Sequence, residues 1–238
     1  MPLYVYIIIG LLPSLIWLLF FLRKDTHPES GRMILQVFFY GMLIAIIAAF
    51  VEIAFSKIIG QNWEKDFPFL FFFTYSLIGV AFVEEFLKYS VVRQKVLRNS
   101  EFDEPLDAML YMIIVALGFA ALENILVLLP SERPLLLTET IYITSLRFIG
   151  ATFLHALCSG TIGFFLALSL LKTKKRLWFM FVGLGISSFL HSLYNFSIIK
   201  TADNFYFILI PIIILIALAL FTSFGFRKLK KIASVCKL

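Results

Sequence analysis

The chain has 238 residues, of which 61% are hydrophobic and 15% charged, and its mean hydropathy is +0.96. This composition excludes a water-soluble domain and is typical of a polytopic membrane protein. The formal net charge of +6 calls for no nucleic-acid partner, because basic loops beside membrane helices and their attraction to the lipid bilayer account for it.

Seven apolar stretches reach the roughly 20 residues that a helix needs to cross the hydrocarbon core. In chain order they cover residues 2–22, 33–55, 68–92, 106–129, 141–171, 177–199 and 205–226. We therefore predict an all-α transmembrane bundle of about seven spans, forming a single domain over residues 1–238. The fifth stretch is long enough to be tilted or to extend beyond the bilayer.

The positions of Lys and Arg predict the orientation of the bundle, because basic residues concentrate in cytoplasmic loops. Fifteen of them follow the first, third, fifth and seventh stretches, whereas the opposite loops hold only four, namely Lys57, Lys65, Arg133 and Lys200. We expect the N-terminus outside and the C-terminus, with Lys237, in the cytoplasm of a multi-pass cell-membrane protein.

Ionisable residues inside the stretches are confined to the middle of the chain. The first and last stretches have none, and the others contain Glu52, Glu84, Glu85, Lys88, Asp107, Glu123, Arg147, His155 and His191. We therefore expect a polar core over approximately residues 68–199, with the helices at 2–22, 33–55 and 205–226 at its periphery. Glu52 lies near a helix end and Asp107 in a first helical turn, so we assign both a structural role.

The third stretch carries the most unusual charges. A charged side chain near the centre of a membrane helix costs roughly 2.5–3.5 kcal/mol on insertion scales. Glu84 precedes Lys88 by four residues and Glu85 precedes it by three, so one helix face brings all three together. They could form a structural salt-bridge cluster, but several costly groups at one depth favour a functional site.

Three glutamates and two histidines within the bundle suit hydrolysis by an activated water molecule. A carboxylate can act as general base, an imidazole can relay a proton, and an N–H group can stabilise an oxyanion. Alternatively, His155, His191 and a carboxylate from Glu85 or Glu123 supply the donor set of a catalytic zinc. These residues have no diagnostic ligand spacing, so the residues alone leave metal use open.

Four motifs in this order resemble those of the PrsW family of membrane proteases: EExxK at 84–88, FxxxEN at 119–124, Arg147 with His155 eight residues later, and HxxxN at 191–195. The resemblance implies catalytic roles for Glu84, Glu85, Glu123, His155, His191 and Asn195, with support from Lys88, Asn124 and Arg147. It also implies Glu85, Glu123, His155 and His191 as candidate ligands of a zinc ion. The sequence departs from the family pattern at Ala108, where a glycine is expected.

The resemblance further implies an intramembrane endopeptidase, dependent on a metal or on glutamate. Its expected partner is a single-span membrane protein, such as an anti-sigma factor cut at site 1 during a stress response. Two other functions fit polar groups inside a membrane bundle: a proton-coupled transporter, and a catalytically inactive scaffold or immunity protein.

Overall fold

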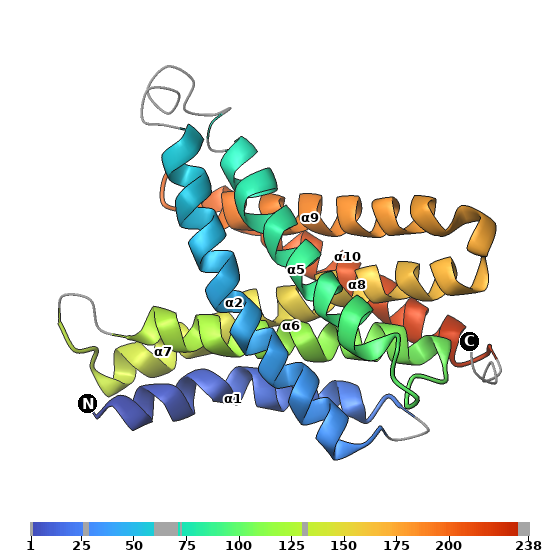
Figure 1. Cartoon of the computed structure of the whole chain (residues 1–238). Coiled ribbons are helices and arrows are strands. Elements are labelled where there is room, and N and C mark those ends of the chain that lie inside the picture. The colour runs from blue at the N-terminus through green and yellow to red at the C-terminus, as the bar shows by residue number, and fades with distance from the viewer. Residues whose placement is uncertain (1, 26–28, 60–70, 72, 130–132, 233–238) are drawn as a thin grey trace.

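A computed structural model describes residues 2–25, 29–59, 71, 73–129 and 133–232. Its regular structure is helical throughout, and the described residues contain no strand. The predicted all-α, polytopic fold is therefore confirmed (Figure 1). Residues 68–70 and 72 of the third predicted stretch lie outside the described residues, as do Lys65 and Lys237.

Within the described residues, six helical segments are long and apolar enough to cross a bilayer. They are α1 (Leu3–Leu22), α2 (Gly31–Ile59), α6 (Pro105–Leu128), α7 (Leu137–Ile149) together with α8 (Ala151–Leu171), α9 (Arg176–Lys200) with the preceding turn η3 (Thr173–Lys175), and α10 (Leu209–Leu229) with the turn η4 (Phe205–Ile208). Each coincides with one of the seven predicted stretches.

The third predicted stretch forms the remaining long helical segment. It consists of η1 (Tyr75–Phe82), α5 (Val83–Val91) and η2 (Val92–Val96), and it runs beside α2 (Figure 1). It differs from the six segments in composition, because it contains more charged residues than they do in their apolar parts. The π-helical η1 and η2 flank α5, and such wide turns are frequent at functional sites.

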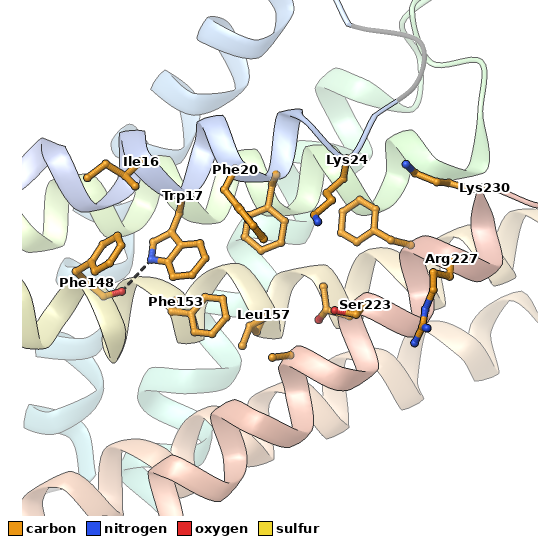
Figure 2. A pocket seen from close by; sticks show the side chains of 14 residues that line it. Ile16, Trp17, Phe20, Lys24, Phe148, Phe153, Leu157, Ser223, Arg227 and Lys230 are labelled. Carbon is orange, nitrogen blue, oxygen red and sulfur yellow. Dashed lines mark hydrogen bonds between the residues drawn. The ribbon is translucent and has the colours of Figure 1, made fainter.

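The fifth predicted stretch, 141–171, is not one continuous helix. α7 ends and α8 begins at Gly150, where φ is −93° and ψ is −97°. A Cβ atom at Gly150 would overlap the hydroxyl of Tyr194 on α9 and approach the backbone carbonyl of Leu146 closely, so glycine leaves room for both groups. The backbone carbonyl of Phe148, near the end of α7, accepts a hydrogen bond of 2.9 Å from Trp17 Nε1 on α1 (Figure 2), which satisfies an acceptor that the end of a helix leaves free.

α6 forms the centre of the bundle, packed against α1, α2 and α8. Glycines permit this packing: a Cβ at Gly41 would overlap the carbonyl of Val115, and one at Gly163 would overlap the backbone of Met109. In α6 and in α7–α8, 78% of the apolar membrane-length segment is buried, whereas the buried share in α1, α2 and α10 is 22–33%. The helices that we expected at the periphery therefore each keep a largely exposed face.

Two of the described connections lie at the same end of the bundle (Figure 1). Segments 97–104 and 173–175 lie at the end where the described chain finishes, and the N-terminus lies at the opposite end (Figure 1). Asp107 lies in the first turn of α6 and accepts hydrogen bonds from the backbone N–H groups of Asp103 (3.0 Å) and Glu104 (2.8 Å). This helix-capping geometry gives Asp107 a structural role.

Candidate functional site

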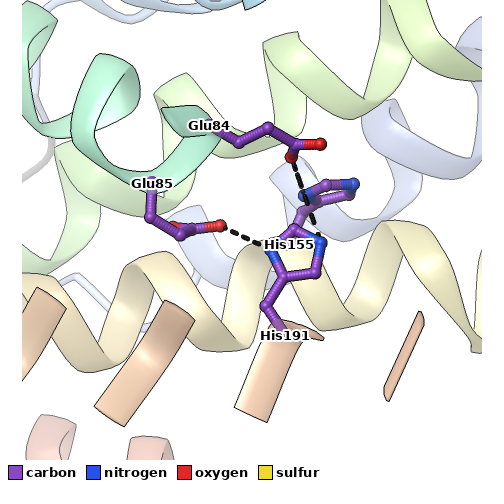
Figure 3. A group of neighbouring side chains, drawn as sticks. All are labelled: Glu84, Glu85, His155 and His191. Carbon is purple, nitrogen blue, oxygen red and sulfur yellow. Dashed lines mark hydrogen bonds and ion pairs between the residues drawn. The ribbon is translucent and has the colours of Figure 1, made fainter. Parts of the chain in front are cut away.

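Side chains from three helical segments converge inside the bundle. α5 contributes Glu84, Glu85 and Lys88, α8 contributes His155, and α9 contributes His191. Each of these residues is at most 4% exposed. One ligand atom from each of the two glutamates and two histidines lies within 4.8 Å of the others (Figure 3), so residues separated by more than 100 positions form one compact cluster.

Lys88 holds the cluster together. It is fully buried, and its Nζ lies 3.1 Å from Glu84 Oε2, 2.9 Å from Glu85 Oε1 and 2.9 Å from His155 Nδ1. The ring of Phe119 lies beneath the ammonium, with its centroid 4.1 Å away. Because an ammonium has three N–H donors, these three contacts use all of them, and Lys88 has none left for a substrate.

The hydrogen bonds select one tautomer for each histidine in its neutral form. A lysine ammonium only donates, so His155 Nδ1 accepts and its Nε2–H donates to Glu123 Oε2 at 2.9 Å. An ionised carboxylate only accepts, so His191 Nδ1–H donates to Glu85 Oε1 at 3.1 Å. In the neutral imidazole, the Nε2 of His191 is then an acceptor, and it lies 4.0 Å from Glu84 Oε2.

The two adjacent glutamates have different environments. Glu85 is fully buried; its Oε1 contacts Lys88 and His191, and its Oε2 accepts a hydrogen bond of 2.8 Å from Ser159. Glu84 makes its ion pairs and hydrogen bonds with described residues through Oε2 alone. Glu84 therefore keeps acceptor capacity for a further ligand, whereas Glu85 is committed to orienting its neighbours.

A second group of polar residues borders the cluster on the side of Glu123. Arg147 pairs with Glu123 at 3.0 Å and also donates to Asn124 Oδ1. Asn124 in turn donates to Thr152 Oγ1 at 3.0 Å. The network connects α6, α7 and α8 across the interruption at Gly150, and it fixes Glu123 against His155.

The structure brings together most, but not all, of the predicted site residues. Glu123, a predicted metal ligand, lies beside the four-residue cluster rather than in it, whereas Glu84 belongs to it. Asn195 is half-buried and lies one turn after His191. Among the described residues, no hydrogen bond connects it to the cluster. Glu52, which we expected to be structural, interacts electrostatically with Glu84 and Glu123. The helical spacing places Ser159 on the same face as His155, but the sequence reasoning gave neither Glu52 nor Ser159 a role in this site.

The donors fit a divalent metal ion in type and charge. Imidazole nitrogens and carboxylate oxygens are ordinary zinc ligands, and Glu84, His155 and His191 provide both kinds. With neutral histidines, the three carboxylates exceed the charges of Lys88 and Arg147 by one negative charge. Lys88 occupies Glu84 Oε2 and His155 Nδ1, so a metal ion and this ammonium compete for the same atoms.

Residues 29–222 match the family described as PrsW family intramembrane metalloprotease. The chain belongs to the PrsW family. It is 31% identical to a protein named Protease PrsW from Geobacillus kaustophilus, over 78% of this chain and 76% of that protein. It is 29% identical to the Protease PrsW of Bacillus subtilis, over 95% of this chain and 94% of that one. No solved structure matches this chain.

Membership of the PrsW family makes this multi-pass membrane protein an intramembrane protease. The resemblance inferred from the four motifs is thereby confirmed. The matched region contains every residue of the buried cluster.

Proposed function

We propose that this PrsW-family protein is an endopeptidase that cuts a single-span membrane protein, such as a membrane-anchored anti-sigma factor. The observation that carries the proposal is the pair formed by Glu84 Oε2 and His191 Nε2, two buried acceptors 4.0 Å apart. One bridging water molecule can span this separation. The family's proteolytic activity supports peptide hydrolysis as the reaction.

The proposed reaction begins when Glu84 and His191 each accept one hydrogen bond from the same water molecule. These two bonds direct a lone pair of the water oxygen toward the peptide carbonyl. Glu84 then takes a proton as the oxygen attacks, and returns it to the leaving amine. Such general acid–base catalysis contributes about 10²–10⁴-fold to a rate.

The neighbouring residues prepare this pair without touching the water. Glu85 accepts from His191 Nδ1–H, which orients the ring with its Nε2 toward Glu84, and in the neutral imidazole that nitrogen is an acceptor. Ser159 fixes the second oxygen of Glu85. The side-chain amide of Asn195 is the donor that we propose for the oxyanion, because it follows His191 by one helical turn and Lys88 has no free N–H.

A zinc ion, when bound by Glu84, His155 and His191, would polarise the carbonyl and acidify a water molecule. In that case Glu84 and His191 would hold the ion through atoms that otherwise hold the water, whereas Glu85, Ser159 and Asn195 would keep the roles described above. The excess negative charge of the cluster supports binding of a cation, and the contacts of Lys88 oppose it.

The experiment reconstitutes purified protein in liposomes with single-span substrates tagged at both ends, and identifies the products by mass. We expect the wild-type protein to cut within or beside the membrane segment, and both Glu84→Gln and His191→Ala to abolish cleavage while remaining folded. Glu139→Gln is the matched control, because that carboxylate forms an ion pair with Arg133 away from the cluster. Cleavage by both variants at the wild-type rate would contradict the proposed site.

A second arm of the same experiment addresses the metal. Treatment with a chelator, followed by addition of zinc, should abolish and restore cleavage if the cluster works as a metal centre. Cleavage that persists through chelation would assign water activation to the carboxylate alone.

A further inference from the structure

A cleft of about 860 Å³ lies on the side of α8 away from His155, between α1, α8 and α10. Its volume falls in the range of small-molecule sites, about 300–1,000 Å³. Phe153 and Leu157, which flank His155 in sequence, line the cleft, whereas His155 itself belongs to the buried cluster. The cleft is therefore separate from the proposed catalytic site.

One end of the cleft is a wall of stacked aromatic rings. The ring of Trp17 stacks on Phe153 with centroids 4.1 Å apart and on Phe148 with centroids 5.3 Å apart. Its N–H already donates to the Phe148 carbonyl. The wall therefore offers apolar ring surface and no free donor, which suits a hydrocarbon chain.

The other end is positively charged. Lys24 follows α1, Arg227 lies in the last turn of α10, and Lys230 comes directly after it (Figure 2). All three are exposed, and none forms an ion pair with another residue in the described ranges. Thr222 also lines the cleft; its hydroxyl is buried and has no hydrogen-bond partner in the described chain.

The charge and the position of these groups match an anionic lipid. Helix ends lie at the depth of lipid headgroups, and basic pockets between membrane helices bind acidic headgroups. Lys24 follows Trp17 by seven residues, about 10 Å along a helix, so a headgroup at Lys24 places the upper part of an acyl chain against the aromatic wall. A lipid without net charge would offer these three cations no net negative charge.

We propose that this cleft binds an anionic phospholipid, with its phosphate at Lys24, Arg227 and Lys230 and an acyl chain against Trp17. Each basic residue near an anionic lipid contributes about fivefold to binding, so the three together contribute about a hundredfold. The site needs no substrate, and its occupancy can be measured without cleavage.

The experiment uses Trp17 as the reporter, in a Trp63→Phe/Trp178→Phe background, reconstituted in phosphatidylcholine vesicles. Phosphatidylglycerol with brominated acyl chains, which quenches tryptophan on contact, is compared with brominated phosphatidylcholine. We expect phosphatidylglycerol to quench Trp17 at a much lower mole fraction. Lys24→Gln/Arg227→Gln/Lys230→Gln should remove that preference.

The matched control is Lys172→Gln/Lys174→Gln/Lys175→Gln, which removes the same charge from exposed residues around η3. It should leave the quenching of Trp17 unchanged. Equal quenching by both lipids in the protein with its native charges would mean that the cleft merely opens to bulk lipid. Absence of quenching by either lipid would mean that protein, such as a second copy of the chain, covers it. Either result, or an equal loss of preference in the control, overturns the proposal.

Discussion

Replacing Lys88 with methionine should destabilise the protein strongly at neutral pH and much less in mild acid. The substitution keeps the length of the side chain but removes the ammonium that contacts Glu84, Glu85 and His155. Removing one partner from a buried ion pair typically costs about 3–5 kcal/mol, because the other charge stays buried.

The loss of stability has an upper limit, because the carboxylate of Glu84 or Glu85 that loses Lys88 as its partner can take up a proton instead. An unperturbed glutamate has a pKa of about 4.3, and one pKa unit corresponds to 1.36 kcal/mol. Protonation therefore costs about 3.7 kcal/mol at pH 7 and about 1 kcal/mol at pH 5. We expect Lys88→Met to lower the free energy of unfolding by up to these amounts at the two pH values.

The assay is reversible unfolding of the purified protein in mixed detergent micelles at pH 5 and pH 7. Lys174→Met, at an exposed site, should change stability by less than about 0.5 kcal/mol. Glu85→Gln combined with Lys88→Met should recover much of the loss, because the uncompensated charge is gone. A loss below about 1 kcal/mol at pH 7, or an equal loss at both pH values, would refute the reasoning.

Two further predictions concern helix packing and a titrating loop. Gly41→Ala should destabilise the protein by about 1–3 kcal/mol in the same unfolding assay, because its Cβ would overlap the backbone of Val115, whereas Gly185→Ala, which meets nothing within 4 Å, should stabilise it by roughly 0.5–1 kcal/mol. Equal effects would refute the close approach of α2 and α6. Burial, assisted by the charges of Asp107 and Asp25 and opposed by the hydrogen bond from Tyr111, raises the pKa of Glu29 to about 8. The folded state therefore binds more protons here than the unfolded state, so stability should fall as pH rises from about 4.3 to about 8. Glu29→Gln should reduce that slope in a series of unfolding measurements, and an unchanged slope would contradict the assignment.

The positions of the membrane helices followed from the sequence, because hydrophobic length and charge are properties of each segment alone. The interruption at Gly150 did not. It depends on Tyr194 of α9 and on Trp17 of α1, which contact this point only after the bundle assembles. The same apolar sequence is compatible with a continuous helix and with an interrupted one.

The contacts within one helix were also accessible from the sequence. Spacings of three and four residues predicted that Lys88 would meet both glutamates, and the structure has those ion pairs. The bond from Ser159 to Glu85 and the electrostatic influence of Glu52 depend on how α8 and α2 rotate toward α5. Those rotations follow from packing between helices, so no local spacing could have indicated them.

The central claim, that Glu84 activates water in this PrsW-family protease, is tested most directly by single-turnover cleavage in proteoliposomes. The rate for wild-type protein is compared with the rate for Glu84→Gln at equal amounts of folded protein. The proposed mechanism predicts a decrease of about 10²–10⁴-fold for the variant. A decrease of less than about tenfold, with the same cleavage position, would contradict it.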